Sequence, residues 1–236
     1  MKLKLVQLKY PRKIVPMVDQ PNSIGAGGIG LVGAHRTGKT TTAMVAAKQL
    51  GLKFVPIETS GVAKAMNHSF NDPCIIKQMG FQMRVLEHAM EEYDKAKTEF
   101  FITDRTPIDM LAYAYVNLNE SNIKNSEVGS EMIDEMYSQY AKCCYDTLNC
   151  YFGNLFYVQP GIPIKPEEGK GHPSAAYMDH LSAIMGGLLI PVMPPIIVHA
   201  WPREVTGLVQ RVSMIKQRLE MSLQLQHTTQ EFQRLM

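Results

Sequence analysis

The sequence has little net charge and few cysteines. Its 24 Lys and Arg residues nearly balance 22 Asp and Glu residues, so the net charge is only +2. That balance gives no strong case for a nucleic-acid or membrane-surface partner, which a clear excess of basic residues usually marks. No two cysteines among Cys74, Cys143, Cys144 and Cys150 form a C-x-x-C pair. We therefore expect reduced, mostly buried thiols and a cytoplasmic location, with no disulfide framework and no zinc site.

A long uninterrupted apolar run is also absent. The longest apolar stretch covers residues 181–200 and contains a Gly-Gly pair at 186–187 and three prolines between 191 and 195. The N-terminus alternates lysine with leucine and lacks the apolar segment of a signal peptide. We expect the apolar stretch to form a helix end, a turn and a strand, with no membrane span and no membrane partner.

The composition suits one α/β domain, with 45% hydrophobic and 19% charged residues. Strand-like and helix-like segments alternate, which predicts a parallel sheet between two helical layers. We expect an N-terminal extension at 1–27, a domain at 28–236 and a small lid at about 159–173. The predicted strands are 29–32, 53–57, 99–103, 154–158 and 195–199, and the predicted helices are 38–50, 74–97 with an interruption near Gly80, 107–118, 127–151, 175–185 and 204–230.

One glycine-rich stretch carries the clearest chemistry. Gly33, Gly38, Lys39 and Thr40 satisfy G-x-x-x-x-G-K-[ST], after an apolar strand and before a helix. The glycines let backbone N–H groups approach a polyphosphate, Lys39 would neutralise its outer phosphates, and the Thr40 hydroxyl would hold Mg²⁺. The residues predicted to bind the phosphates are Gly33, Arg36, Gly38, Lys39, Thr40 and Thr41.

A second motif follows the third predicted strand. Motor ATPases would end such a strand in Asp-Glu, and a guanine-reading Asn-Lys-x-Asp is missing, whereas this strand ends in Asp104-Arg105. Asp104 could assist the metal or accept a proton, and Arg105 could neutralise a transferring phosphate through two parallel hydrogen bonds. The pair fits phosphoryl transfer to a small acceptor, although a structural ion pair or a helix cap is the alternative.

Residues 33–41 and 101–114, together with 156–163, resemble the small P-loop kinases and ATPases often encoded by bacteriophages. These are related to nicotinamide-riboside, thymidylate and deoxynucleoside kinases. The resemblance covers about residues 28–220. It implies a five-stranded parallel sheet of order 2-3-1-4-5, magnesium-ATP as donor, and a nucleoside, nucleotide or modified base as acceptor. A phage origin would place the protein in the host cytoplasm.

Glu58 directly follows the second predicted strand, at the place where deoxynucleoside kinases keep a glutamate that accepts the proton of the acceptor hydroxyl. It could equally support magnesium or cap a helix. Phe81 could stack on a base, Gln82 could read its edge and Arg84 could hold a phosphate, or the three could be a core aromatic, a capping amide and a solvated charge. Tyr113 and Tyr115 are expected in the core.

The lid departs from the family pattern, which usually includes an arginine. Lys165 and Lys170 are the lid cations here, and no arginine lies between Arg105 and Arg203. Lysine supplies charge but not the planar fork of a guanidinium. Arg203 and Arg211 are possible substitutes.

The leading hypothesis is a magnesium- and ATP-dependent kinase of a deoxynucleoside monophosphate. Two alternatives stay open within the class, a deoxynucleoside kinase and a kinase of hydroxymethylated pyrimidines in DNA, and the near-neutral charge counts against DNA. A different class, a nucleotide-gated binding module with slow ATPase activity, also stays open. The apolar stripe of the last helix could be core or a homodimer seam; it comprises Val205, Leu208, Val209, Val212, Ile215 and Leu219.

Overall fold

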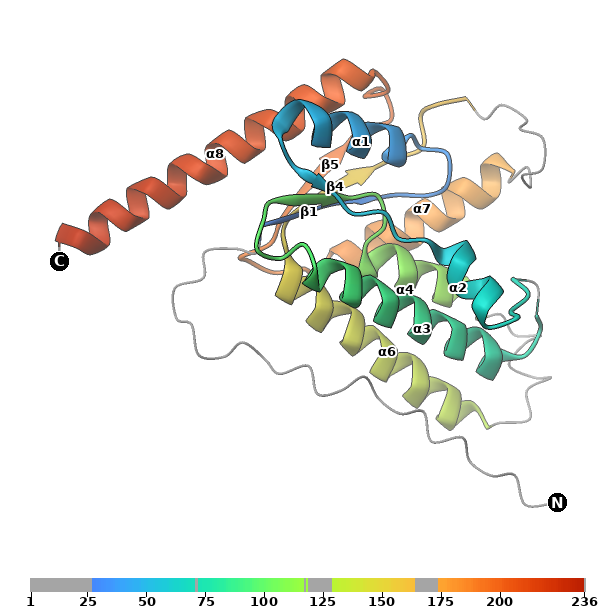
Figure 1. Ribbon diagram of the computed structural model, residues 1–236. Helices are drawn as coiled ribbons and strands as arrows, with labels where there is room; N and C mark the ends of the chain where they lie inside the picture. Colours follow the sequence, from blue (N-terminus) through green and yellow to red (C-terminus); the bar gives the residue numbers. More distant parts are fainter. Residues whose placement is uncertain (1–26, 71, 117, 119–128, 164–173, 236) are drawn as a thin grey trace.

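The computed structural model describes residues 27–70, 72–116, 118, 129–163 and 174–235, except for the side chains at 223 and 225–235 (Figure 1). Its centre is a five-stranded sheet made of β1 (Gly28–Val32), β2 (Lys53–Phe54), β3 (Phe101–Thr103), β4 (Phe152–Val158) and β5 (Ile197–Trp201). All neighbouring strands pair in parallel, in the order β2-β3-β1-β4-β5. This confirms the fold class and strand order that the sequence led us to expect.

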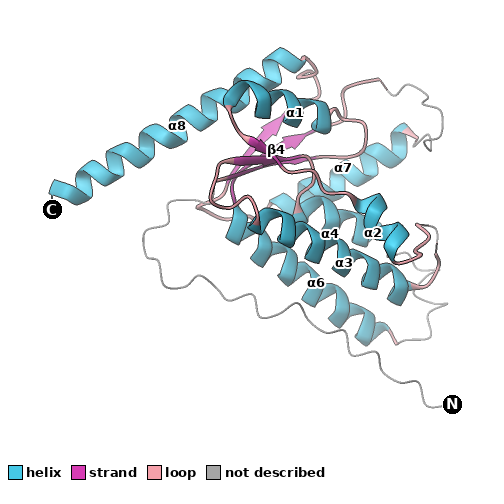
Figure 2. Cartoon of the chain, viewed as in Figure 1, coloured by secondary structure: helices cyan, strands magenta, loops and turns pink. Residues whose placement is uncertain are grey.

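Helices cover both faces of the sheet (Figure 2). On one face lie α1 (Lys39–Leu50) and α8 (Leu208–Leu235). On the other lie α3 (Ile75–Asp94), α4 (Pro107–Val116), α6 (Ser130–Tyr151) and α7 (Ala175–Leu189), with the short α2 (Thr59–Ala65) at their edge. The two faces bury separate apolar clusters, because alternate strand residues point to opposite sides.

The strand β1 shows this alternation clearly. Ile29 and Leu31 pack toward α1 and α8, whereas Val32 joins the cluster on the opposite face. Gly30 also points to that opposite face, where an added Cβ would lie 2.6 Å from Thr106 and 2.8 Å from Leu155. The glycine therefore lets the start of α4 pack directly on the central strand.

Several element boundaries differ from the sequence predictions. The helix α3 runs through Gly80 without interruption, because open space surrounds that position and nothing deflects the chain. The helix α7 continues through Gly186 and Gly187 to Leu189, since Gly186 leaves room for the ring of Tyr157, whose hydroxyl donates to the carbonyl of Ser182 at 2.6 Å. These two interruptions were wrong predictions.

Other differences concern the second strand and the segment after it. Regular strand geometry covers only Lys53–Phe54, although Val55 still donates its N–H to Ile102 at 2.9 Å. The helix α2 was not predicted. Residues 1–26 of the expected extension and 164–173 of the expected lid lie outside the described residues.

The four cysteines are free, as expected, but they are less buried than expected. Cys144 is fully buried, Cys74 and Cys143 are partly exposed, and Cys150 lies at the surface. In α8, Val212 and Ile215 belong to the core, as does the preceding Val205, while Val209 is 84% exposed. No helix in the described part of the chain is long and apolar enough to cross a bilayer.

Candidate active site

The loop between β1 and α1 has the backbone shape of an anion-binding turn. Gly38 has φ +84° and Arg36 has φ +59°, both in the left-handed region that turns successive N–H groups toward one side. Gly38 caps α1, so the loop also meets the positive end of that helix. Arg36 holds this conformation without being a glycine, a feature typical of functional turns.

The Lys39 side chain closes over this loop. Its ammonium donates to the carbonyls of Gly33 and Ala34, the latter at 2.8 Å, and lies 3.8 Å from a carboxylate oxygen of Asp109. The side chain is only 12% exposed. Burial is the main cause that lowers the pKa of Lys39, and the Asp109 carboxylate opposes it. The lysine thus bonds to the part of the loop where a polyphosphate is expected.

Asp109 lies beside Lys39, although no motif in the sequence indicated a role for it. It is 2% exposed. One carboxylate oxygen accepts the N–H of Gly33 at 3.2 Å, and the other accepts the N–H and hydroxyl of Thr106 at 3.0 and 2.6 Å. Burial raises the pKa of Asp109, and Lys39 is the largest opposing influence. Asp109 therefore ties the phosphate loop to the segment that follows Arg105.

The sequence Thr106-Pro107-Ile108-Asp109 explains this placement. Thr106 precedes Pro107, the first residue of α4, and Asp109 is the third helical residue. The Thr106 hydroxyl accepts the N–H of Asp109 at 3.4 Å while the carboxylate accepts the N–H of Thr106, which is a capping box with proline at the first position. The cap fixes the direction in which the chain leaves β3, and hence the position of Asp104 and Arg105.

Thr40 and Asp104 meet at the open side of the loop. The Thr40 hydroxyl donates to the Asp104 carboxylate, although the two residues are 64 positions apart. A hydroxyl and a carboxylate are the hard oxygen donors that Mg²⁺ prefers. These two residues fit a magnesium site that takes its other ligands from phosphate and water.

Arg105 lines a large cavity of the described structure. Its guanidinium carbon lies 5.5 Å from the centre of the Tyr113 ring, and its carbonyl accepts the hydroxyl of the fully buried Tyr93 at 2.6 Å. The Tyr113 ring also contacts His35, with ring centres 4.8 Å apart. Tyr113 and Tyr115 both pack against the core, as expected, and Tyr113 also lines this cavity.

The cavity beside Arg105 has a volume of about 950 Å³. Its lining residues come from the loop after β1, from α2 and the segments on either side of it, from the end of β3, and from α3, α4 and the start of α7. Its lining includes Glu58, Phe81, Gln82 and Arg105 of the predicted site, together with His35, Ile57, Thr59, Ser60, Phe70, Gln78, Val85, Tyr113, Val116 and Tyr177. The structure thus brings the predicted base, the predicted base-reading residues and the predicted transfer arginine to one space.

Phe81 and Gln82 form the inner wall of this cavity. Phe81 is 2% exposed and stacks on His68 at a ring distance of 4.2 Å, with Phe70 edge-on at 5.5 Å. Gln82 is 7% exposed, and its side-chain amide has no hydrogen bond to other described residues. The amide is not among the buried side-chain groups that lack a partner, and it lines the cavity, where a ligand can bond to it.

Arg84 does not take part. Its guanidinium pairs with Glu87 at 3.0 Å and with Glu91 at 3.5 Å along the exposed side of α3, and it is not among the residues that line the cavity. The prediction that Arg84 holds an acceptor phosphate is therefore not supported by its position.

His35 extends from the phosphate loop into the same cavity. Desolvation against Tyr113 is the main cause that lowers its pKa to about 4, and the neighbouring cations Arg105, Lys39 and Arg36 lower it further. The imidazole is therefore neutral at pH 7, with one ring nitrogen able to donate and the other to accept a hydrogen bond.

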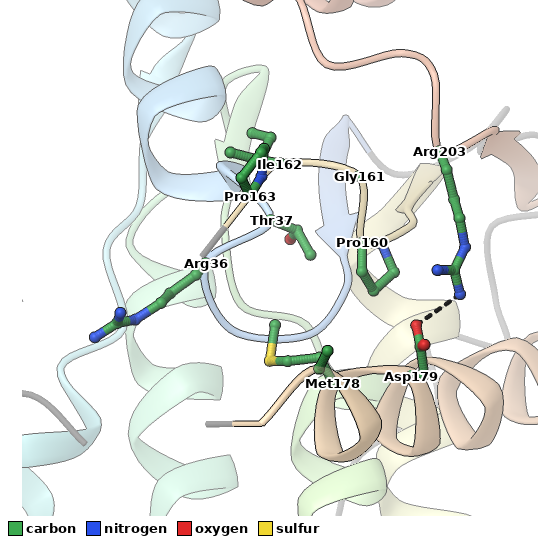
Figure 3. Close-up of a pocket in the computed structure, with 10 residues that line it drawn as sticks. Arg36, Thr37, Pro160, Gly161, Ile162, Pro163, Met178, Asp179 and Arg203 are labelled. Carbon is green, nitrogen blue, oxygen red and sulfur yellow. Dashed lines mark hydrogen bonds and ion pairs between the residues drawn. The ribbon is translucent and has the colours of Figure 1, made fainter. Parts of the chain in front are cut away.

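A smaller pocket of about 250 Å³ lies on the β4 and β5 side of the loop (Figure 3). Arg36 and Thr37 line it from the loop, and Gly161, Ile162 and Arg203 line it from the segments that follow β4 and β5. Arg203 is exposed, and its guanidinium pairs with Asp179 at 2.6 Å at the edge of this pocket. The predicted lid residues Lys165 and Lys170 lie outside the described residues.

No family model and no curated protein matches the sequence. The structure is similar to deoxyadenosine kinase from M. mycoides with the products dCMP and a flexible dCDP bound, at 15% identity over 82% of this chain and 99% of that chain, with a TM-score of 0.60. It is also similar to thymidylate kinase from Candida albicans, at 15% identity over 84% of this chain and 92% of that chain, with a TM-score of 0.54. The chain therefore has the fold of the P-loop nucleoside and nucleotide kinases.

Proposed function

We propose that this protein transfers the γ-phosphoryl group of ATP to the hydroxyl of a nucleoside bound in the cavity beside Arg105. The observation that carries the proposal is the position of Asp104 and Arg105. Asp104 bonds to Thr40 of the phosphate loop, and the next residue lines the acceptor cavity. A donor site and an acceptor site thus meet at one pair of adjacent residues, as phosphoryl transfer requires.

The donor would bind on the loop through backbone N–H groups, Lys39 and Arg36. Lys39 would exchange its bonds to Gly33 and Ala34 for phosphate oxygens. Thr40 and Asp104 would hold Mg²⁺, which neutralises phosphate charge and orients the phosphates when bound. The pocket of about 250 Å³ next to Arg36 and Thr37 would give room for the donor base.

The reaction needs one proton acceptor and one charge stabiliser. The acceptor oxygen forms a bond to the γ-phosphorus as the bond from that phosphorus to the β,γ-bridging oxygen breaks and its electron pair leaves with ADP. The hydroxyl proton passes to the Glu58 carboxylate. Arg105 neutralises the equatorial oxygens through its planar fork. Glu58 is free for this role because its side chain makes no capping hydrogen bond to α2.

A hydroxyl acceptor fits the charges of the cavity better than a phosphate acceptor does. Of the charged side chains that line it, Arg105 is the one cation and Glu58 the one carboxylate among the described residues. Arg84, the second cation expected for a monophosphate, pairs with glutamates outside. The geometry therefore favours the nucleoside alternative over the monophosphate that the sequence first suggested.

Phe81 and Gln82 would recognise the base. The buried Phe81 ring offers an apolar surface, and the Gln82 amide offers one acceptor and two donors with no partner among the described residues. This combination suits a flat heterocycle with a donor beside an acceptor.

A monophosphate kinase remains the second candidate, because Arg105 could bind an acceptor phosphate with both of its terminal nitrogens. Phosphorylation of DNA bases, a homodimer and a slow nucleotide-gated binding module stay predictions from the sequence.

Acceptor-dependent formation of ADP tests the proposal. We would measure ADP release from magnesium-ATP with a panel of nucleosides, monophosphates and hydroxymethylated DNA duplexes. The proposal predicts stimulation by one or more nucleosides. Stimulation by a monophosphate or by DNA would select those alternatives, and release that no acceptor changes would indicate the binding module.

A further inference from the structure

A buried arginine of the last helix lies behind the phosphate loop. Arg211 is 2% exposed and sits in the first turn of α8, the helix that lies beside α1 (Figure 1). Its Nη1 donates to the carbonyl of Thr37 at 2.6 Å and its Nε to the carbonyl of Val205 at 2.8 Å. One side chain thus connects the loop to a helix 174 positions away.

The guanidinium packs closely on its surroundings. It lies over the Trp201 ring, 5.8 Å from the ring centre. A Cβ added to Gly38 would lie 2.9 Å from Arg211 Nη1, so the guanidinium touches the residue that precedes Lys39. The loop therefore rests on Arg211 at Thr37 and Gly38.

No counter-charge pairs with Arg211 in the described part of the chain. Within the described residues it forms no ion pair, and its hydrogen bonds go to two neutral carbonyls. Burial lowers its pKa and no acidic neighbour offsets this, yet a guanidinium stays protonated at neutral pH. An uncompensated buried cation is costly to the fold, and an anion bound nearby would reduce that cost.

We propose that Arg211 is a positioning residue of the donor site, which fixes the loop through Thr37 and places positive charge behind the ATP polyphosphate. The inference rests on the proposed function in one respect, namely that the loop binds a nucleotide. It differs from the expectation that Arg211 replaces a lid arginine, because its hydrogen bonds reach the loop from the protein interior.

Calorimetric titration with Mg-ADP tests this role without requiring turnover. Arg211→Met removes the charge and both hydrogen bonds, and we expect it to weaken ADP binding about tenfold to a hundredfold. Arg211→Lys keeps the charge without the fork, so we expect a smaller loss of about threefold to tenfold. Arg218→Met is the matched control, since Arg218 lies two turns further along α8 and is exposed. It should bind ADP like the wild type.

The rise in melting temperature on adding Mg-ADP separates this role from a purely structural one. The proposal is supported if Arg211→Met folds and Mg-ADP raises its melting temperature less than that of the wild type. The melting temperature of the variant without ADP does not enter this comparison. Folded Arg211→Met protein that binds ADP as tightly as wild type overturns it. If Arg211→Met does not fold, the same measurements are made on Arg211→Lys. An affinity of Arg211→Lys for ADP equal to that of the wild type then overturns the proposal. A wild-type protein that does not bind Mg-ADP overturns both this inference and the proposed donor site.

Discussion

The backbone N–H of Gly33 donates to the carboxylate of Asp109 at 3.2 Å, across 76 positions of the chain. The same carboxylate holds Thr106, which directly follows Arg105. Buried hydrogen bonds of Asp109 therefore set the distance between the loop after β1 and Arg105.

Asp109→Asn should therefore impair both stability and turnover. An amide has one oxygen, so it cannot accept from Gly33 and Thr106 at once, and its NH₂ would face one of the two backbone N–H groups that the carboxylate accepts. We expect the free energy of unfolding to fall by about 1–3 kcal/mol and kcat to fall at least about tenfold. Urea denaturation and steady-state kinetics measure the two effects. Thr106→Val removes the two hydrogen bonds of the hydroxyl but keeps the bonds from the N–H groups of Gly33 and Thr106 to the carboxylate, so it should cost less in both. An Asp109→Asn enzyme with normal kcat would contradict the account.

Arg105→Lys should lower turnover more than donor binding. The lysine keeps a positive charge but loses the planar fork and the stacking on Tyr113. We expect kcat to fall about tenfold to a hundredfold, with little change in the dissociation constant for ADP. Arg84→Ala is the control, because Arg84 pairs with glutamates outside the cavity. Wild-type turnover in Arg105→Lys would make Arg105 a structural residue.

Glu58→Gln distinguishes the two acceptor classes. If the acceptor is a hydroxyl, loss of the base should reduce kcat by about a hundredfold or more. If the acceptor is a phosphate, which is already anionic, the effect should be small. The fold should not suffer, because the Glu58 side chain caps no helix. The measurement is kcat with the best acceptor from the panel, and a negligible loss would favour the monophosphate alternative.

His199 should make the fold sensitive to acid. Burial beside Phe156, with a smaller contribution from Arg218, lowers its pKa from 6.5 to about 4. Because the folded pKa lies below the unfolded one, the unfolded chain binds the proton first, and stability falls as pH drops from about 6.5 toward 4.

For this half-buried group we expect a loss of about 1 kcal/mol between pH 7 and pH 5, after allowance for solvent screening. His199→Asn should lose less stability over the same interval, measured by urea midpoints at both pH values. An equal loss in the two proteins would show that His199 does not contribute. His35, whose pKa is also lowered to about 4, contributes to both proteins equally.

The sequence was sufficient for the sheet and for the turn between β1 and α1, because both leave local signals. Short apolar runs located the strands, and the glycine spacing with Lys39 and Thr40 located the loop. The order of the strands came from the family resemblance and was confirmed. The short length of β2 could not be predicted from the sequence. The uninterrupted α3 and α7 could not be predicted either, because whether a helix continues through a glycine depends on the neighbours that pack around it.

The residues that line the cavity beside Arg105 were harder to predict from the sequence. Helical periodicity nevertheless indicates some of them. Gln78, Phe81, Gln82 and Val85 recur at one face of α3 and all line the cavity. Arg84 falls on the opposite face, where its glutamate partners follow at three and seven positions.

Asp109 and Tyr113 are likewise four residues apart on α4, and Asp109 is the one charged residue of that apolar helix. This pattern marks a buried carboxylate with a specific partner. That this partner is the N–H of Gly33 depends on how the start of α4 packs against β1, and no local sequence pattern contains that information.

The most direct measurement is the fate of the labelled γ-phosphate in a single turnover with magnesium-ATP and a nucleoside that stimulates ADP release. The account predicts that label appears on the nucleoside in a one-to-one ratio with ADP, and that Lys39→Ala, with its fold intact by circular dichroism, forms neither product. Label found only as free phosphate, or undiminished transfer by Lys39→Ala, would contradict it.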